Sequence, residues 1–144
     1  MPKGLPKLAQ AYMAAWNSHD WNKVAAFFTD DCVYEDAAVD RVCHGKQELK
    51  AFGDELKVFR ADGPMFELKS AFASGDWMVS EWVMSDTYAG GIPGLEAAVG
   101  KKYSIRGASI SELHKGKISR NTDYWNMASF LQQLGLMPSA APKK

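Results

Sequence analysis

Two carboxylic acids within aromatic, apolar segments are the residues of this sequence best suited to acid–base chemistry. Alternation places Tyr34 and Asp36 on one face of an expected strand. In a later strand, Asp123 shares a face with Asn121 and Trp125. Apolar surroundings raise the pKa of a carboxyl group, which makes the group a usable proton donor or acceptor near neutral pH. Asp36 and Asp123 are therefore the candidate catalytic acids.

Each acid also has an ordinary structural explanation. Asp36 lies at the end of its strand, where carboxylates are commonly solvated. Asp123 could lie on an exposed sheet face, paired with Arg120 or Arg106. Strict alternation puts Ser119 on the face of Asp123, and it assigns the opposite face to Ile118, Arg120, Thr122 and Tyr124. The pattern alone leaves both explanations open.

Aromatic and sulfur-containing residues supply candidate ligand contacts. Tyr12 and Trp16 lie one turn apart on an expected helix, and a buried Tyr hydroxyl aimed into a cavity can donate to a developing oxyanion. Trp82 and Met84 share a strand face that suits a flat apolar ligand, and Phe59 follows on a third helix. Plain core packing is the alternative for each of them.

Metal and cofactor motifs are missing from the sequence. His19, His44 and His114 are far apart and show no ligand spacing. The sequence contains no G-x-S-x-G nucleophile elbow, no P-loop and no G-x-G-x-x-G fingerprint. We therefore expect neither a metal nor a cofactor.

Length and charge describe one globular domain. The 144 residues are 47% hydrophobic and carry a formal net charge of zero, which fits a single domain over 1–136 with a flexible tail over 137–144. Balanced charge and the absence of a long apolar run predict a cytoplasmic protein that binds neither nucleic acid nor membrane. Cys32 and Cys43 are expected to be reduced packing residues.

Hydrophobic periodicity changes from helical to alternating along the chain. Spacings of three and four precede residue 62, and a period of two follows from residue 66. Helices followed by hairpins predict an α+β fold, a curved antiparallel sheet and helices that close it into a cone with a central pocket. The expected helices are 5–16, 21–28, 49–59 and 127–134, and the expected strands are 32–36, 66–72, 77–88, 103–113 and 118–125.

Several local motifs, taken in order, resemble the nuclear transport factor 2-like superfamily, which includes ketosteroid isomerases and SnoaL-like polyketide cyclases. Residues 11–20, 27–31 and 33–36 resemble the amino half of a ketosteroid isomerase. Residues 116–126 and 130–135 resemble the carboxyl end of SnoaL-like proteins. The resemblance extends from about Leu8 to Leu136.

The resemblance implies a role for each of four residues. Tyr12 matches the oxyanion donor of the isomerases, Asp36 their general base, and Asp123 the general acid/base of the cyclases. Ser109 occupies the position of an isomerase Asp or a cyclase His, and a hydroxyl there is a weaker donor. The proline that usually follows the isomerase base is Ala37 here.

Residues and resemblance together predict a cofactor-free isomerase, cyclase or lyase that moves protons on a hydrophobic aromatic or polycyclic small molecule. Tyr34, Asn121 and Trp125 complete the expected ligand contacts. One alternative is an epoxide hydrolase, in which Asp123 holds water with Asn121 or Tyr34 nearby, although Thr122 replaces the Arg of the similar hydrolase ending. The other alternative is a non-catalytic ligand-binding or dimerisation module.

Two further expectations concern surfaces. Outward-facing apolar residues such as Ile110 and Tyr124 predict a homodimer formed by sheet packing, and the resemblance implies the same. The glycine-rich segment 89–102 is expected to be either a lid or a long hairpin connection.

Overall fold

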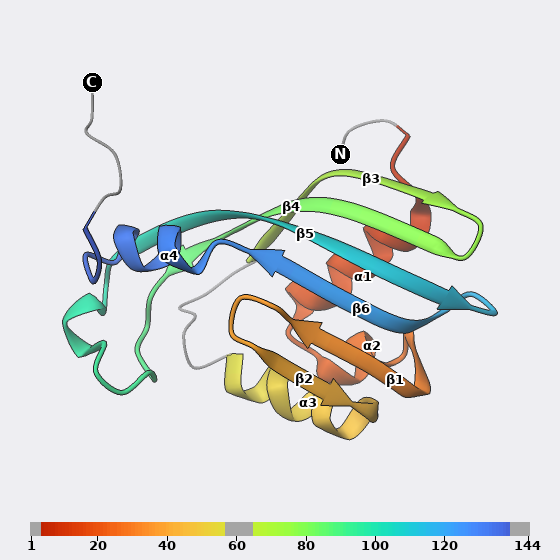
Figure 1. The fold of residues 1–144 in the computed structure, drawn as a ribbon, viewed down its shortest axis with the longest axis horizontal. Coiled ribbons are helices and arrows are strands. Elements are labelled where there is room, and N and C mark those ends of the chain that lie inside the picture. Colours follow the sequence, from red (N-terminus) through yellow and green to blue (C-terminus); the bar gives the residue numbers. More distant parts are fainter. Residues whose placement is uncertain (1–3, 57–64, 139–144) are drawn as a thin grey trace.

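The computed structural model describes residues 4–56 and 65–138, and it contains three amino-terminal helices, a six-stranded sheet and a carboxyl-terminal helix (Figure 1). Phe59 and most of the predicted tail lie outside the described residues. The helices are α1 (Lys7–Ser18), α2 (Trp21–Ala25), α3 (Gly45–Leu56) and α4 (Met127–Gln133). The strands are β1 (Phe28–Asp36), β2 (Arg41–His44), β3 (Phe66–Ser74), β4 (Trp77–Thr87), β5 (Lys102–His114) and β6 (Lys117–Trp125).

The strands lie in the order β2-β1-β6-β5-β4-β3. Consecutive hairpins make the pairings of β3, β4, β5 and β6 antiparallel, as the sequence predicts. The pairing of β1 with β6 is parallel, so the predicted antiparallel sheet is confirmed except at this one pairing. The difference arises because β1 and β6 are distant in sequence and no hairpin joins them.

Two local predictions in the amino half need correction. The second helix ends at Ala25, and Phe28 begins β1 instead of continuing a helical face. The sequence reading also missed β2, because four residues are too short for a visible alternation. A turn that includes Asp40, with a φ of 57°, joins β1 to β2.

A bulge in β6 overturns the strict alternation predicted for that strand. Glu112 pairs with Arg120, but the next residue of β5, Leu113, pairs with Ile118. Ser119 is therefore an extra residue that resets the alternation. As a result Ile118 is fully buried on the same side of the sheet as Asp123, where the sequence predicted the opposite side.

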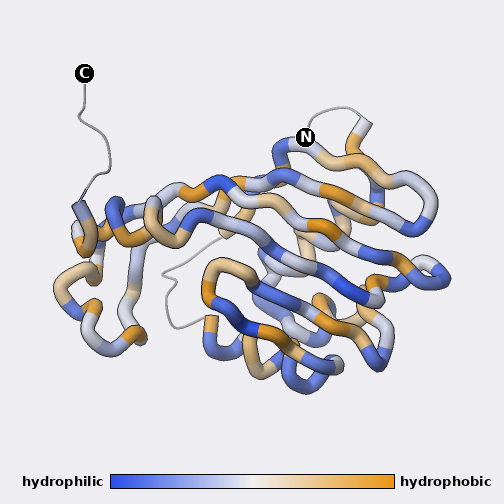
Figure 2. Tube along the Cα trace, in the orientation of Figure 1, coloured by the Kyte–Doolittle hydropathy of each residue, from blue (hydrophilic) through white to orange (hydrophobic). Residues whose placement is uncertain are grey.

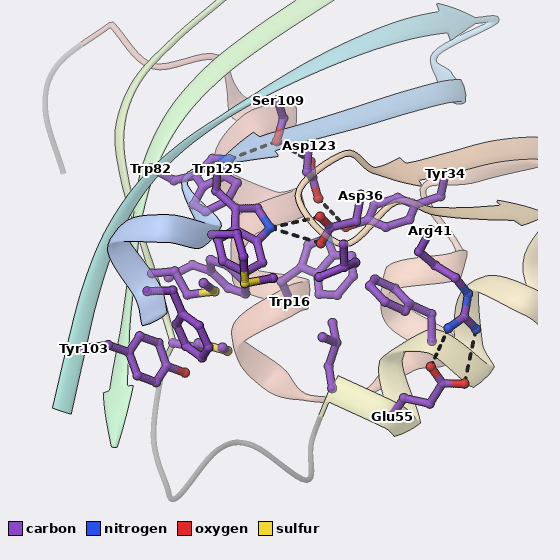
Figure 3. A pocket seen from close by; sticks show the side chains of 18 of the residues that line it. Trp16, Tyr34, Asp36, Arg41, Glu55, Trp82, Tyr103, Ser109, Asp123 and Trp125 are labelled. Carbon is purple, nitrogen blue, oxygen red and sulfur yellow. Dashed lines mark hydrogen bonds and ion pairs between the residues drawn. The ribbon is translucent and has the colours of Figure 1, made fainter. Parts of the chain in front are cut away.

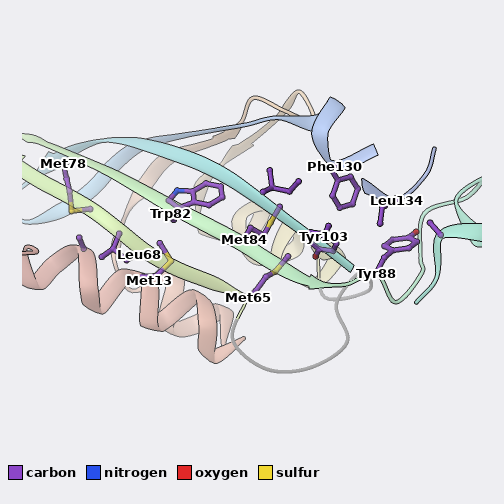
Figure 4. Close-up of a cluster of buried hydrophobic side chains, with 13 residues drawn as sticks. Met13, Met65, Leu68, Met78, Trp82, Met84, Tyr88, Tyr103, Phe130 and Leu134 are labelled. Atoms are coloured by element: carbon purple, nitrogen blue, oxygen red, sulfur yellow. The ribbon is translucent and has the colours of Figure 1, made fainter. Parts of the chain in front are cut away.

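The helices cover the inner face of the sheet and divide its core into two clusters. One cluster joins α1, α2 and α3 to β1 around Tyr12, Trp16 and Phe28. The other lies between α1, β4, β5 and α4, and Figure 4 shows Trp82 and Phe130 within it. Because the helices cover different parts of a curved sheet, a space remains between the two clusters.

Hydrophobic and hydrophilic residues follow one another along the strands (Figure 2), and several large apolar side chains are exposed. Ile110 and Tyr124 are 41% and 51% exposed, as the sequence predicts for the outer face. Cys32 and Cys43 are buried free thiols on neighbouring strands. No helix among the described residues is long and apolar enough to cross a membrane.

Candidate active site

Five polar residues form a row across the inner face of the sheet, with one residue on each of five neighbouring strands. The register pairs Arg41 with Asp36, Asp36 with Asp123, Asp123 with Ser109, and Ser109 with Ser80. Paired residues have Cα atoms about 5 Å apart, so the row is continuous. All five line one cavity. We call these residues the polar row.

An apolar cavity of about 480 Å³ lies against the polar row (Figure 3). Its volume falls within the range of sites that bind small molecules. Aromatic and aliphatic side chains from the helices and from five of the strands form the remaining walls, and these strands are β1, β3, β4, β5 and β6. The side chains include Tyr12, Met13, Trp16, Tyr34, Phe52, Leu56, Met65, Phe66, Trp82, Met84, Tyr103, Trp125, Met127, Phe130 and Leu131.

Asp123 accepts hydrogen bonds from three side chains. The Tyr34 hydroxyl donates to Oδ2, and Ser109 Oγ and Asn121 Nδ2 donate to Oδ1 at 2.6 Å and 2.8 Å. The alternative in which Asp123 pairs with Arg120 or Arg106 is wrong, because within the described residues the partners of Asp123 are these three side chains, and Arg120 Nε lies 3.8 Å from Glu112 Oε1. A carboxyl group surrounded by three donors is held in a fixed orientation.

The indole N–H of Trp82 sets the direction of the hydrogen bonds around Asp123, because it can only donate. Trp82 Nε1 donates to Ser109 Oγ at 2.8 Å, and an indole N–H has no acceptor capacity. The Ser109 hydrogen is therefore free to point at Asp123. On the other side, Ser111 donates to Asn121 Oδ1 at 2.7 Å, which leaves the Asn121 amide hydrogens for Asp123. The network favours the ionised form of Asp123.

Asp36 is the less constrained of the two acids. Trp125 Nε1 donates to both of its oxygens, at 3.0 Å and 3.1 Å, and the Ala38 amide donates to Oδ1 at 3.1 Å. The side chain is buried, with the residue only 6% exposed. This burial raises the pKa of Asp36 to about 6, and the neighbouring Asp123 charge acts in the same direction.

Burial also raises the pKa of Asp123, although the hydrogen bonds from Ser109, Tyr34 and Asn121 oppose that shift. Two adjacent acids with raised pKa values titrate as a pair. Asp123 accepts hydrogen bonds from more side chains than Asp36 does, and such bonds favour the ionised form. We therefore expect that, when the pair holds one proton, this proton lies on Asp36. The pair can therefore take up and release a proton at a pH close to neutral.

Tyr12 lines the same cavity, and its buried hydroxyl is an uncommitted donor. The residue is 6% exposed, and its hydroxyl has no hydrogen-bond partner within the described parts of the chain. Burial, followed by the charge of Asp123, raises the pKa of Tyr12 well above its ordinary value. The hydroxyl therefore stays protonated and can donate to a ligand oxygen.

The structure brings together most of the residues that the sequence singled out. Trp16, Tyr34, Trp82, Met84 and Trp125 all line the cavity. Asn121, by contrast, is fully buried behind Asp123 and does not line the cavity. Ser109 donates its hydrogen bond to Asp123 instead of into the cavity. Phe59 lies outside the described residues.

Sequence reasoning missed the ends of the polar row. Arg41 lies on the short β2 strand, and Ser80 is one small hydroxyl within a long apolar strand. Neither residue has a neighbour in sequence that signals chemistry. Only the register across β2, β1 and β6 shows that Arg41 lies beside the acids.

The glycine-rich segment contributes to the cavity wall. Ile92 and Leu95 line the cavity. Two backbone hydrogen bonds join the ends of the segment: the Tyr88 amide donates to the Lys101 carbonyl at 2.8 Å, and the Gly100 amide donates to the Tyr88 carbonyl at 2.8 Å. The Ile92 amide donates to the Tyr88 hydroxyl at 3.0 Å. The segment is therefore an anchored cover as well as a connection between β4 and β5.

Gly107 makes room for Trp82, and its replacement tests the support of the acid network. A Cβ atom at this position would lie 2.2 Å from the indole ring. We expect Gly107→Ala to displace Trp82 from Ser109 and to lower the free energy of unfolding by about 1–3 kcal/mol, as overpacking does. Urea denaturation would measure this. In the Trp82→Ala background the same substitution should cost much less, and an equal cost in both backgrounds would contradict the explanation.

No group of three or more His, Cys, Asp or Glu residues in the described parts of the chain is placed to hold a metal ion.

The curved sheet, closed by helices over one cavity, defines the nuclear transport factor 2-like fold, which is also called ketosteroid isomerase-like. The chain belongs to the SnoaL-like domain family, whose pattern matches residues 9–121. No curated protein sequence matches the chain.

Solved structures show the same fold at low sequence identity. A protein from Catenulispora acidiphila with a ketosteroid isomerase-like fold, solved with trimethylamine, has 21% identity and a TM-score of 0.79 over 96% of this chain and 99% of its own. AclR, a candidate hydroxylase from Streptomyces galilaeus, has 24% identity and a TM-score of 0.75 over 93% and 86%. A candidate polyketide cyclase from Xanthomonas campestris has 23% identity and a TM-score of 0.73 over 88% and 93%.

Proposed function

We propose that this protein is an enzyme that moves protons on a hydrophobic aromatic or polycyclic small molecule, in an isomerase, cyclase or lyase reaction. The observation that carries the proposal is the pairing of Asp36 with Asp123 inside one apolar cavity. Relatives of the same fold that are named as candidate polyketide cyclases support it.

The proposed reaction begins with removal of a proton from a carbon next to a carbonyl group. Ionised Asp36 accepts the proton, and the substrate oxygen gains negative charge. The free Tyr12 hydroxyl donates to that oxygen and stabilises it. Asp36 then returns the proton to another atom of the substrate. Asp123 stays ionised and fixes the positions of Tyr34 and Ser109.

Proton exchange tests this proposal before the substrate is known. The protein is incubated in deuterated water with a panel of enolisable aromatic and polycyclic ketones, and NMR follows the loss of the α-proton signals. We expect exchange with the wild type for at least one compound and none above background with the Asp36→Asn/Asp123→Asn double variant. Equal exchange by both proteins, or none by either, would count against the proposal.

Replacement of Asp123 should also change the pH dependence of exchange. The Asp123 charge helps to raise the pKa of Asp36. Asp123→Asn removes that charge, so the pKa of Asp36 should fall and the acidic limb of the rate profile should move to lower pH. Measurement of exchange rates between pH 4 and 8 would show this, and a limb that stays in place would contradict the coupling of the two acids.

A second candidate function is the opening of an epoxide by water. The Tyr34 hydroxyl contacts Asp123, as this function requires, whereas both polar ends of the Asn121 side chain are already bonded to protein groups. Labelled oxygen from water would enter the product of a hydrolase and would be absent from the product of an isomerase.

We also propose a homodimer formed through the outer face of the sheet. Ile110 and Tyr124 are exposed on neighbouring strands, and Ala108, two residues from Ile110, pairs with Tyr124. Light scattering should give twice the monomer mass for the wild type and the monomer mass for Tyr124→Asp. A wild-type monomer at working concentration would contradict this proposal.

A further inference from the structure

The cavity has a charged end that the proposed reaction does not use. Arg41 begins β2, Glu55 lies near the end of α3, and both line the cavity (Figure 3). The strand pairing places Arg41 at one end of the polar row and Ser80 at the other. Arg41 Nη1 and Nη2 donate to Glu55 at 2.6 Å and 3.2 Å. Arg41 is the only Lys, Arg or His among the cavity-lining residues that the structure describes.

The guanidinium group of Arg41 is held in place by more than its ion pair. Its Cζ atom lies 5.1 Å from the centre of the Phe52 ring, and Phe52 is buried. A guanidinium group stacked on an aromatic ring keeps its N–H edges free for two parallel hydrogen bonds. The orientation of Arg41 would therefore survive the departure of Glu55.

The bond to Glu55 is one that a ligand could replace. The two side chains are 37% and 55% exposed, and ion pairs with this degree of exposure contribute little to stability. A carboxylate on the ligand would offer Arg41 the same two oxygen atoms. At the acidic centre of the polar row, Asp36 and Asp123 would repel such a group, so only one orientation of the ligand is favourable.

We propose that the ligand of this cavity carries a carboxylate, and that Arg41 binds this group in place of Glu55 while the apolar body of the ligand lies against the aromatic walls. The proposal rests on the proposed function only in taking this cavity as the ligand site. It adds a substrate class, aromatic carboxylic acids, and it makes Arg41 the residue that orients the ligand beside Asp36.

Matched pairs of probes test the role of the ligand charge. Naphthylacetate and biphenylacetate carry the carboxylate, and their primary amides have nearly the same shape without the charge. Calorimetry and quenching of tryptophan fluorescence would measure binding to the full chain. We expect the wild type to bind each acid about tenfold more tightly than its amide, because hydrogen bonds between charged groups are stronger than neutral ones.

Three variants separate the role of Arg41 from a general effect of charge. Arg41→Met should weaken acid binding to the level of amide binding, with a much smaller effect on the amide. Glu55→Gln weakens the internal competitor, so it should strengthen acid binding more than amide binding. Arg120→Met is the matched control, because Arg120 forms its ion pair with Glu112 and does not line the cavity. It should behave like the wild type.

The outcomes also distinguish this inference from the proposed function. Equal binding of acid and amide by both the wild type and Glu55→Gln would overturn the inference. A preference for the acid that persists in Arg41→Met would also overturn it, and so would the failure of every probe to bind. Proton exchange on neutral ketones without an acid preference would overturn the inference alone. An acid preference that depends on Arg41, in a protein that exchanges no protons, would support the inference and count against the acid–base reaction.

Discussion

Asp36→Asn is expected to lower proton exchange and turnover by about a hundredfold or more while the fold is kept, as the loss of a general base usually does. The fold should survive because an amide oxygen at the Oδ1 position can still accept from Trp125 and from the Ala38 amide. The amide cannot take a proton from carbon. Initial rates at saturating ligand, with circular dichroism as a check on folding, would measure the effect.

The neighbouring acid supplies a matched control for this substitution. Glu35 precedes Asp36 on β1, but it does not line the cavity, and it accepts a long hydrogen bond of 3.4 Å from Thr122. Glu35→Gln should therefore keep turnover near the wild-type value. Near wild-type turnover in both Asp36→Asn and Asp123→Asn would remove the basis for acid–base catalysis in this cavity.

Asp36→Asn is also expected to stabilise the protein at neutral pH. Burial raises the pKa of Asp36 from 3.8 to about 6, so the folded state binds the proton more tightly than the unfolded state does. Proton binding by Asp36 therefore stabilises the folded state. This stabilisation is complete below the pKa of Asp36 in the unfolded state and is lost as the pH rises through its pKa in the folded state. Above that range, ionised Asp36 lowers the free energy of unfolding by up to ~3 kcal/mol relative to acidic conditions.

Urea denaturation of wild type and variant at several pH values would measure this cost. An Asn side chain resembles the protonated acid, so the two proteins should have similar stability at about pH 4. The advantage of Asp36→Asn should grow between about pH 5 and 7 and then level off. Because acids other than Asp123 titrate equally in both proteins, the difference between them reports Asp36 together with its coupling to Asp123. A difference that does not change with pH would contradict the raised pKa.

The two predictions together describe an exchange of stability for reactivity. An acid that is costly to ionise within the fold is also a better proton acceptor than an ordinary surface carboxylate. Stability and turnover should therefore respond in opposite directions to Asp36→Asn. A purely structural Asp36 would not link the two measurements in this way.

The class of fold could be predicted from the sequence because its signals are local. The stripe of apolar residues around Tyr12 and Trp16 specifies α1, and the alternation from Phe66 onward specifies the hairpins. The parallel pairing of β1 with β6 could not be predicted, because it joins segments more than eighty residues apart and leaves no periodic trace. The short strand β2 was missed for lack of length.

The candidate site could be predicted only in part. Asp36, Asp123 and Tyr12 were identified by residue type and by resemblance, and all three line the cavity. The bonds of Asn121 and Ser109 to Asp123 depend on how side chains fill the space between strands, which the sequence does not reveal. Arg41 was missed because its proximity to the acids is a property of strand register.

The extra residue in β6 makes this site unusually sensitive to a change in chain length. Side chains along a strand alternate between its two faces, yet both Ile118 and Asp123 point inward, which is possible only because Ser119 is accommodated between them. Deletion of Ser119 would force the strand to turn one of these two side chains toward solvent. Evolution of this chain can therefore exchange side chains around the cavity far more easily than it can shorten β6 by a single residue.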